Sequence, residues 1–189
     1  MKKAVFIDKD GTLINNVPYN ADPALVSLQE GAALSLQLLQ ANGYMLVVAS
    51  NQSGVGRGLF SEAALMEVSN KIRQLLPVQL DGFFYCPHLP EDHCVCRKPR
   101  PGLLLQAAAL LNIDLHASWM IGDILHDVEA GNRAGCRTVL LDNGGETEWE
   151  VTELRKPDYI AGDLLDAAAF IIANEHQHKP YVQSSDYPI

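Results

Sequence analysis

Two carboxylates lie two positions apart at the end of an apolar run, in the segment VFIDKDGTL (residues 5–13). Asp8 and Asp10 are close enough to repel each other and to shift each other's pKa unless a cation lies between them. A hard cation such as Mg²⁺ would supply that charge. One carboxylate could then act as a nucleophile while the other moves a proton. A turn or a solvated surface is the alternative interpretation of such a pair.

A second acidic pair, Asp123 and Asp127, lies in the segment GDILHD (residues 122–127). Asp123 taken alone could be a helix cap, because Asp is favoured at the start of a helix. Together with Asp8 and Asp10, however, these acids indicate a cage of oxygen ligands for magnesium.

Two further segments offer groups that bind phosphate. SNQSGVGRG (residues 50–58) is rich in hydroxyl, amide and glycine residues, follows an apolar run, and offers free N–H donors. It lacks the Lys-Ser/Thr ending of a Walker loop. CRKPRPG carries Arg97, Lys98 and Arg100, which favours pairing with phosphate oxygens. A flexible loop and a solvated basic turn are the respective alternatives.

The segment CPHLPEDHCVCRKP contains a pattern typical of zinc ligands. Three thiolates and one imidazole would form a closed tetrahedral set of the structural kind. The alternative is four reduced and unrelated side chains. His93 is a spare candidate, and the isolated Cys136 is expected in the core. The four ligands predicted for zinc are Cys86, His88, Cys94 and Cys96.

Length and composition exclude several classes of protein. The 189 residues indicate one domain, here placed at residues 1–175 and followed by a loose tail at 176–189. A net charge of −9 argues against a nucleic-acid partner, so any phosphate site must use local cations and N–H groups. The longest apolar runs are too short to cross a bilayer, and the N-terminus does not resemble a secretory signal. We therefore expect a cytoplasmic protein without membrane association.

Short apolar runs alternate with helical patterns, which predicts an α/β fold whose parallel sheet is covered on both faces. In such sheets ligands bind beyond the carboxyl ends of the strands, where most of the polar segments above fall. The strands are predicted at residues 4–8, 44–50, 82–86, 118–123 and 137–142, and the helices at 30–43, 61–76, 101–112, 127–135 and 162–175.

The motifs FIDKDGTL, ASNQSG, CRKP and IGDILHD resemble, in order, the four motifs of the haloacid-dehalogenase-like phosphatases. The resemblance spans roughly residues 4–142. It implies a Rossmann-like three-layer α/β/α sandwich. Only about forty residues separate Asp8 from Ser50, and the zinc segment is short, so we expect a nearly capless enzyme. The zinc-binding loop would form one wall of its open site, and residues 15–22 another.

The resemblance implies the chemical roles of four residues. Asp8 would attack phosphorus and form an aspartyl-phosphate, and Asp10 would protonate the leaving oxygen and later activate water. Ser50 would bond the phosphoryl oxygens, and Lys98 would neutralise their developing charge.

The resemblance also implies a magnesium site. Mg²⁺ would be held by Asp8, the backbone carbonyl of Asp10, and Asp123. Asp127 would support the metal or Lys98 from behind these ligands.

Within the superfamily, the zinc segment and SNQSGVGRGLFSE resemble the heptose-bisphosphate phosphatases, with the histidinol-phosphate phosphatases as close cousins. This implies removal of the 7-phosphate of D-glycero-D-manno-heptose 1,7-bisphosphate for surface-polysaccharide synthesis, by a monomer. Histidinol phosphate or another small ester is the alternative substrate, and a non-catalytic zinc-stabilised phosphate-binding module is the third hypothesis. The residues predicted to contact this phosphorylated sugar are Asn16, Tyr19, Asn51, Gln52, Ser53, Arg57 and Arg97. One position departs from the heptose enzymes, because Ile124 stands where a lysine is expected.

Overall fold

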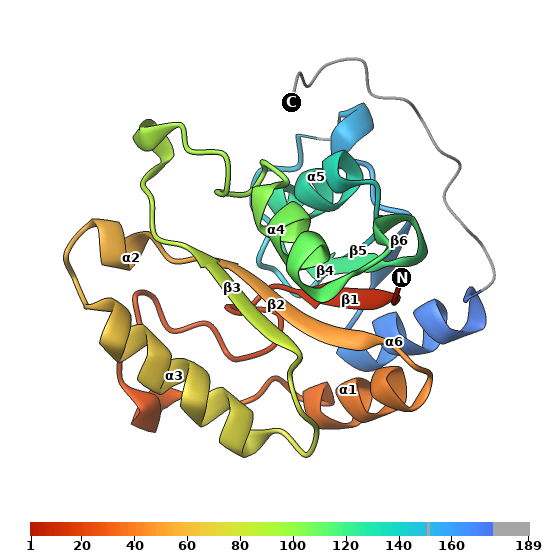
Figure 1. The fold of residues 1–189 in the computed structure, drawn as a ribbon, viewed down its shortest axis with the longest axis horizontal. Coiled ribbons are helices and arrows are strands. Elements are labelled where there is room, and N and C mark those ends of the chain that lie inside the picture. Colours follow the sequence, from red (N-terminus) through yellow and green to blue (C-terminus); the bar gives the residue numbers. More distant parts are fainter. Residues whose placement is uncertain (151, 176–189) are drawn as a thin grey trace.

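A computed structural model of the chain describes residues 1–150 and 152–175. Six strands form one parallel sheet in the order β3-β2-β1-β4-β5-β6 (Figure 1). The predicted tail, residues 176–189, lies outside the described residues, and the assignment of residues 1–175 to one domain stays a prediction. The strands are β1 (Ala4–Ile7), β2 (Met45–Asn51), β3 (Gly82–Cys86), β4 (Trp119–Gly122), β5 (Arg137–Leu141) and β6 (Tyr159–Ala161).

Helices cover both faces of this sheet. Figure 1 shows α1, α3 and α6 on one side and α4 and α5 on the other, which confirms the predicted three-layer α/β/α sandwich. No helix in the described part of the chain is both long enough and apolar enough to span a bilayer. The helices are α1 (Ala32–Ala41), α2 (Ser53–Gly56), α3 (Glu62–Leu75), α4 (Gly102–Leu111), α5 (Leu125–Ala134) and α6 (Leu164–Ala173).

Local sequence signals explain where the helices begin and end. The Ser61 side chain accepts a hydrogen bond from the Ala64 N–H at the start of α3, and Asp163 caps α6 in the same way. Gly43, with a φ of +79°, turns the chain after α1 in the left-handed region that glycine adopts readily. These signals determine where α3 and α6 begin and where the chain turns after α1.

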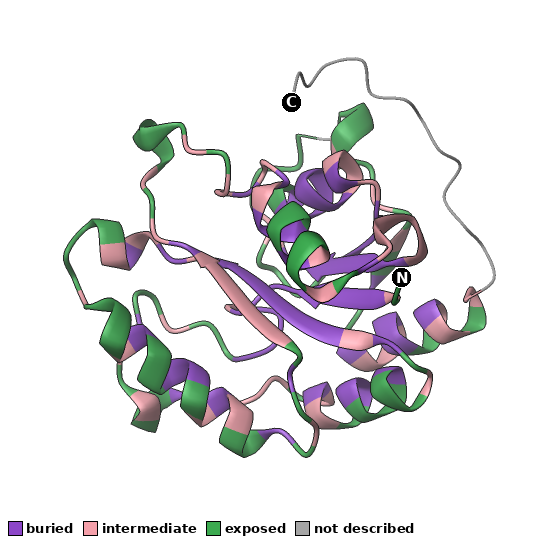
Figure 2. Ribbon diagram, viewed as in Figure 1, coloured by how far each residue is buried: buried purple, intermediate pink, exposed green. Residues whose placement is uncertain are grey.

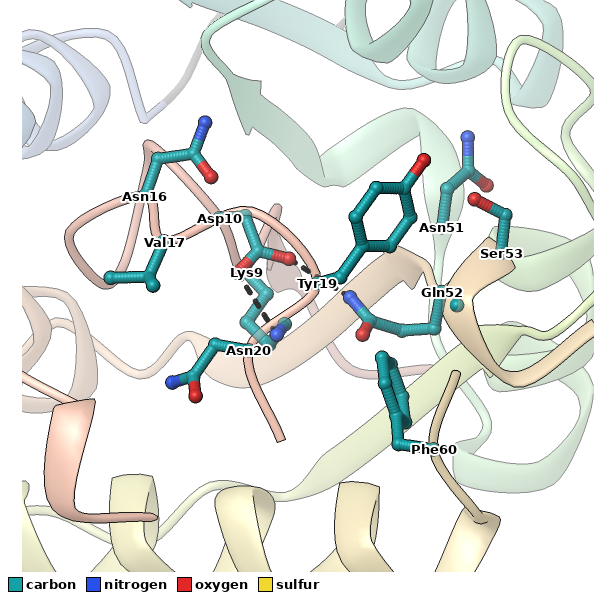
Figure 3. Close-up of a pocket in the computed structure, with 11 residues that line it drawn as sticks. Lys9, Asp10, Asn16, Val17, Tyr19, Asn20, Asn51, Gln52, Ser53 and Phe60 are labelled. Atoms are coloured by element: carbon teal, nitrogen blue, oxygen red, sulfur yellow. Dashed lines mark hydrogen bonds and ion pairs between the residues drawn. The ribbon is translucent and has the colours of Figure 1, made fainter. Parts of the chain in front are cut away.

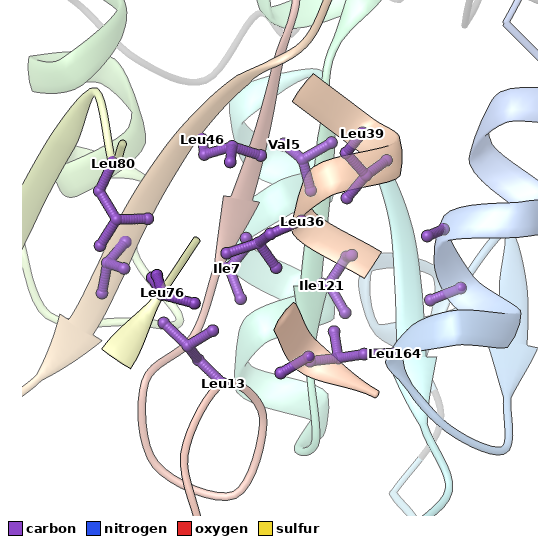
Figure 4. Packing of buried hydrophobic residues seen from close by; sticks show 14 of the residues in the cluster. Val5, Ile7, Leu13, Leu36, Leu39, Leu46, Leu76, Leu80, Ile121 and Leu164 are labelled. Atoms are coloured by element: carbon purple, nitrogen blue, oxygen red, sulfur yellow. The ribbon is translucent and has the colours of Figure 1, made fainter. Parts of the chain in front are cut away.

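The core lies on both faces of the central strands, because alternate side chains of a strand point to opposite faces. Val5 and Ile7 of β1 pack against the α1 side, where Leu36 is fully buried (Figures 2 and 4). Phe6 belongs to the second cluster, which includes Leu104 of α4. β1 is therefore buried on both faces and is a rigid base for the residues that follow it.

Several elements differ from the sequence-based predictions, including α1 and α6, each of which is two residues shorter at both ends than predicted. β6 was not predicted, because its three residues are too few for a periodic pattern; pairing with β5 determines it. The short helix α2 lies in a segment interpreted as a loop or phosphate cradle. α5 begins at Leu125, two residues before the predicted start.

No additional domain is inserted at the two positions after β1 and β3. The stretch between β1 and β2 contains only α1 and the 3₁₀ helix Pro23–Leu25, and the stretch between β3 and α4 contains only the 3₁₀ helix Pro90–Asp92. Both stretches are fully described. The expectation of a nearly capless enzyme is confirmed.

Candidate active site and metal centres

Acidic and basic side chains gather at the carboxyl edge of the three central strands. Asp8 follows β1 directly, Ser50 lies at the end of β2, and Asp123 follows β4. β1 lies between β2 and β4 in the sheet, so these three ends are neighbours. The sheet order therefore produces the crevice expected for a parallel α/β fold.

Three buried acids surround one buried lysine in this crevice. Single oxygens of Asp8, Asp123 and Asp127 all lie within 4.8 Å of one another. Lys98 Nζ lies 2.5 Å from Asp8 Oδ1 and 2.6 Å from Asp127 Oδ1, and it donates to the Ala49 carbonyl at 2.7 Å. The lysine is thus fixed by three oxygens and bridges two of the acids.

The charges in this cluster are not balanced by the protein alone. Burial raises the pKa of Asp8 to about 7 although Lys98 opposes the rise, and burial with the nearby Asp127 raises the pKa of Asp123 to about 6. Burial would lower the pKa of Lys98, but Asp127 and Asp8 together raise it and keep the lysine charged. When ionised, the three carboxylates carry more negative charge than the single ammonium of Lys98 can neutralise. The atoms available to bind a metal are carboxylate oxygens, which are the ligands that hard divalent cations prefer. The residues present therefore fit Mg²⁺.

Two glycines pack closely against the Asp123 carboxylate. Gly11 has a φ of +80°, and a Cβ added at Gly11 or at Gly145 would overlap the Asp123 carboxylate. The Thr12 hydroxyl donates to Asp123 Oδ1 at 3.3 Å, and the Asn143 amide donates to the Gly11 carbonyl at 2.7 Å. Residues 143–145 after β5 therefore approach the site. No motif in the sequence indicates this approach.

Asp10 lies beside this cluster and faces the pocket in Figure 3. Gln52 Nε2 donates to Asp10 Oδ2 at 2.9 Å and to Ser50 Oγ at 2.8 Å. Lys9 Nζ lies 2.9 Å from Asp10 Oδ1. Lys9 was not among the predicted site residues, because a lysine that follows a strand ordinarily reaches solvent.

The pocket of about 110 Å³ next to Asp10 contains five of the seven residues predicted to contact substrate (Figure 3). Tyr19, exposed and with a φ of +53°, lies at its wall together with Asn20, which belongs to the segment 15–22 expected there, and Phe60, which was not predicted. The five predicted residues in its lining are Asn16, Tyr19, Asn51, Gln52 and Ser53.

The other predicted contacts lie apart from the pocket lining. Arg57 is exposed at the end of α2. Arg97 donates to the His88 carbonyl at 3.2 Å. Arg100, expected beside phosphate, instead donates to the Cys94 carbonyl at 2.6 Å and to the His93 carbonyl. Lys98 therefore points in a different direction from the arginines near it in sequence. Its buried ammonium pairs with Asp8 and Asp127, whereas the guanidinium groups of Arg97 and Arg100 donate to backbone carbonyls of their own loop.

Asn51 connects β2 to Lys98. Its Nδ2 donates to the Lys98 carbonyl and its Oδ1 accepts from the Lys98 N–H, both at 3.0 Å. The side chain lines the pocket, and both of its polar atoms hold the backbone of Lys98. Asn51 therefore determines the position of the lysine in addition to any contact with substrate.

The four predicted zinc ligands converge after β3. Cys86 Sγ lies 3.5 Å from both Cys94 Sγ and His88 Nδ1, and Cys96 Sγ lies 3.0 Å from Cys86 Sγ and 3.3 Å from His88 Nδ1. Zn–S bonds in a tetrahedral site place sulfurs about 3.8 Å apart, so a bound ion would require these thiols to move slightly outward from their 3.0–3.5 Å spacing. The four cysteines, all within the described residues, form no disulfide, and Cys136 is buried in the core as expected.

Two of the three thiols in the cluster, those of Cys86 and Cys96, resist ionisation without a cation, whereas burial is outweighed at Cys94 by hydrogen bonds from the Arg97 N–H and the Cys86 thiol, which lower its pKa. Burial raises the pKa of Cys86, and the neighbouring thiol of Cys96 raises it further. A bound zinc would stabilise the thiolates, so the cluster fits a structural zinc site. The site is attached to the crevice, because the Gln52 N–H donates to the Cys86 carbonyl at 2.7 Å and Cys96 is two residues from Lys98.

The raised pKa values predict that magnesium stabilises the protein more at high pH. Asp8 and Asp123 bind protons more tightly in the fold than in the unfolded chain, where the pKa is near 3.8. Without magnesium, stability is therefore lost as pH rises from about 4 to about 7, and the loss persists above pH 7. Magnesium binds the ionised carboxylates, so its addition should raise the melting temperature by several degrees at pH 8 and little at pH 5.

Thermal melts of zinc-loaded protein, with and without Mg²⁺ at both pH values, test this expectation. The variant Asp8→Asn is the control and should show a smaller dependence on pH and on Mg²⁺. Equal stabilisation by Mg²⁺ at pH 5 and pH 8 would contradict the expectation.

Comparison with known proteins agrees with this geometry. A family model described as HAD-hydrolase-like matches residues 95–167. The D-glycero-β-D-manno-heptose-1,7-bisphosphate 7-phosphatase of Pasteurella multocida is 38% identical over 180 residues, which cover 90% of this chain and 97% of that protein. The enzyme of the same name from Escherichia coli K12 is 35% identical over 187 residues, covering 94% and 96%.

Solved structures show the same similarity. The D,D-heptose 1,7-bisphosphate phosphatase of B. bronchiseptica, crystallised with magnesium and phosphate, has a TM-score of 0.77 and 29% identity over 91% of this chain and 99% of its own. A HAD-like phosphatase from Mesorhizobium loti has a TM-score of 0.77 and 32% identity, covering 90% and 87%. The chain belongs to the haloacid-dehalogenase-like hydrolases, in the family of the D-glycero-β-D-manno-heptose-1,7-bisphosphate 7-phosphatases.

Proposed function

We propose that the protein is a Mg²⁺-dependent phosphomonoesterase that removes the 7-phosphate of D-glycero-β-D-manno-heptose 1,7-bisphosphate. The observation that supports this most directly is the buried Asp8–Lys98–Asp127 arrangement with Asp123 beside it. Relatives with 35–38% identity along nearly the whole chain carry the name of this activity. The substrate is thus inferred from the relatives and the chemistry from the site.

Asp8 acts as the nucleophile in the proposed mechanism. A carboxylate oxygen of Asp8 forms a bond to phosphorus while the bond from phosphorus to the sugar oxygen breaks, and the Asp10 carboxyl gives its proton to that oxygen. Water then attacks the aspartyl-phosphate, the Asp8–phosphorus bond breaks, and the Asp10 carboxylate takes the proton from water. The products are the alcohol and inorganic phosphate, and both aspartates return to their starting states.

Lys98 and Ser50 stabilise the phosphoryl group in transfer. Lys98 is held charged next to the nucleophile, where its ammonium offsets the negative charge on phosphoryl oxygens. The buried Ser50 hydroxyl accepts from Gln52, which leaves its own hydrogen for a phosphoryl oxygen. Asp127 keeps Lys98 oriented through the 2.6 Å ion pair.

Two metals complete the proposal. Mg²⁺ would be held by Asp8, Asp123 and the backbone carbonyl of Asp10, and would supply positive charge that offsets the negative charge of a phosphoryl group. Zn²⁺ would be held by Cys86 and the three ligands after it, and would act only as a crosslink of the loop. A magnesium-bound relative of similar fold supports the first metal.

The sugar is expected against the wall formed by Asn16 and Tyr19, on the pocket side of Asp10. Roles for Arg57 and Arg97 in binding the substrate stay predictions, as do the cytoplasmic location and the monomeric state. Ile124 is half-buried beside Asp123 and contributes no cation for the second phosphate. We therefore expect a weaker contact with that phosphate than a lysine would give.

A comparison of substrates tests the proposal. We expect kcat/KM for the heptose bisphosphate to exceed that for histidinol phosphate by about 100-fold or more, a difference of about 3 kcal/mol in transition-state binding. Both reactions are followed by release of inorganic phosphate with Mg²⁺ present. A hundredfold preference for histidinol phosphate would overturn the substrate, and hydrolysis of neither ester, nor of p-nitrophenyl phosphate, would favour a non-catalytic phosphate-binding module.

A further inference from the structure

The buried lysine next to the nucleophile in sequence, Lys9, has no part in the mechanism above. Its side chain is only 1% exposed, whereas that of Asp10 is 29% exposed and faces the pocket. Figure 3 shows the ammonium of Lys9 directed at the Asp10 carboxylate, with the distance of 2.9 Å between Nζ and Oδ1. Both residues line the pocket, and the aspartate is the more exposed of the two.

A lysine in this position needs a partner. Removing an ammonium from water is unfavourable unless an opposite charge and hydrogen bonds replace the solvent. Among the described residues, the carboxylate that forms an ion pair with Lys9 is that of Asp10. The backbone of Lys9 is also fixed, because its carbonyl accepts from the N–H groups of Leu13 at 3.1 Å and Ile14 at 3.0 Å. The backbone from which the Lys9 side chain extends is thus held in a hydrogen-bonded turn.

Both oxygens of Asp10 are held from different sides. Oδ1 contacts Lys9, and Oδ2 accepts from Gln52, whose amide also contacts Ser50. Gln52 in turn is buried and attached to the Cys86 carbonyl through its backbone N–H. A carboxyl with only one of these contacts would rotate about its side-chain bonds, whereas two contacts on opposite oxygens fix its plane.

We propose that Lys9 is a positioning residue, whose buried ammonium, acting with the Gln52 amide, fixes the Asp10 carboxyl in the orientation from which it gives its proton to the leaving oxygen. The inference rests on the proposed function, because it needs Asp10 as the proton donor. Lys9 does not itself contact the reacting atoms. Its removal should affect the esters whose leaving oxygen needs a proton and spare those whose leaving group departs as a stable anion.

A series of phosphate esters whose leaving groups differ in basicity distinguishes a positioning role of Lys9 from a purely structural role. Substituted phenyl phosphates have one shape and no second phosphate, and p-nitrophenolate departs without protonation. The ratio kcat/KM covers the steps up to departure of the phenol and excludes later hydrolysis of the aspartyl-phosphate. A general fault in folding or metal binding would lower this ratio for all members of the series alike.

In the variant Lys9→Met we expect kcat/KM to fall by about 50-fold for phenyl phosphate and by less than about 5-fold for p-nitrophenyl phosphate. The dependence of rate on leaving-group basicity should become steeper than in the wild type. Lys9→Arg keeps the charge and should recover most of the activity towards phenyl phosphate. Lys2→Met, at an exposed lysine of the same N-terminal segment, is the matched control and should change neither rate.

Equal falls for the two esters, or no fall for either, would overturn the positioning role while leaving the phosphatase assignment intact. Absence of hydrolysis by the wild type itself would instead overturn the proposed function. If Lys9→Met does not fold, as judged by circular dichroism, Lys9→Gln is measured in the same series and should give the same steepening.

Discussion

Replacement Asp8→Asn is expected to lower kcat by roughly 10⁴-fold or more, as occurs when the nucleophile of a covalent mechanism is removed. The substituted side chain would keep its size but offer an amide in place of the attacking carboxylate. Rates of phosphate release from the heptose bisphosphate, measured with saturating Mg²⁺, test the expectation. Rapid quench of the wild type with labelled substrate should trap phosphate on Asp8.

The same variant should fold at least as well as the wild type in the absence of magnesium. Burial raises the pKa of Asp8 to about 7, so its ionised form destabilises the metal-free fold above that pH. Lys98 would retain Asp127 and the Ala49 carbonyl as partners. A melting temperature at pH 8 equal to or above that of the wild type, together with lost turnover, would separate chemistry from stability. Full activity in Asp8→Asn, or no covalent adduct in the wild type, would refute the mechanism.

Loss of zinc is expected to have the largest effect on stability. Purified protein should contain about one zinc per chain, and removal by a strong chelator should lower the melting temperature by at least about 10 °C. The loop from Cys86 to Cys96 has only one short 3₁₀ helix of its own, so the metal would be its main crosslink. Turnover should fall as well, because Cys96 is two residues from Lys98.

Matched cysteine variants distinguish a ligand from an ordinary buried thiol. Cys94→Ser should lose zinc and melt like the chelated protein. Cys136→Ala should keep one zinc per chain, since this buried thiol is not among the four side chains whose ligand atoms converge. A zinc content near zero in the wild type, with unchanged melting in chelator, would exclude the structural site.

The sequence predicted the fold well where its patterns were long. The apolar strand β1 and the capped helix α3 were placed within a residue of their ends, because burial on both faces and the Ser61 cap leave clear signals. β6 was missed because this edge strand has only three residues, too few to carry a periodicity of their own. Its position depends on the neighbour β5 and therefore on tertiary structure.

In the candidate site, too, some features could be predicted from the sequence and others could not. Acids at strand ends could be grouped from their positions in the chain, because the carboxyl ends of parallel strands meet at one edge. The direction of long side chains could not be predicted: Lys9 turns inward, while Arg100 turns back to the carbonyls of its own loop. The approach of Gly145 to Asp123 depends on how the chain leaves β5, which no local motif indicates.

The lack of a cap affects how strongly the negative charges of the protein and of an incoming bisphosphate repel each other. The chain carries a net charge of −9 and, by the proposed function, must admit a ligand with two phosphates. Under a closed lid the distal phosphate would lose its hydration shell in an anionic environment, whereas at an open mouth it stays in contact with bulk electrolyte. Mobile counter-ions there screen like charges beyond about 8 Å at physiological ionic strength. The exposed rim thus allows a strongly acidic protein to take up a strongly acidic molecule by neutralising only the phosphoryl group that reacts.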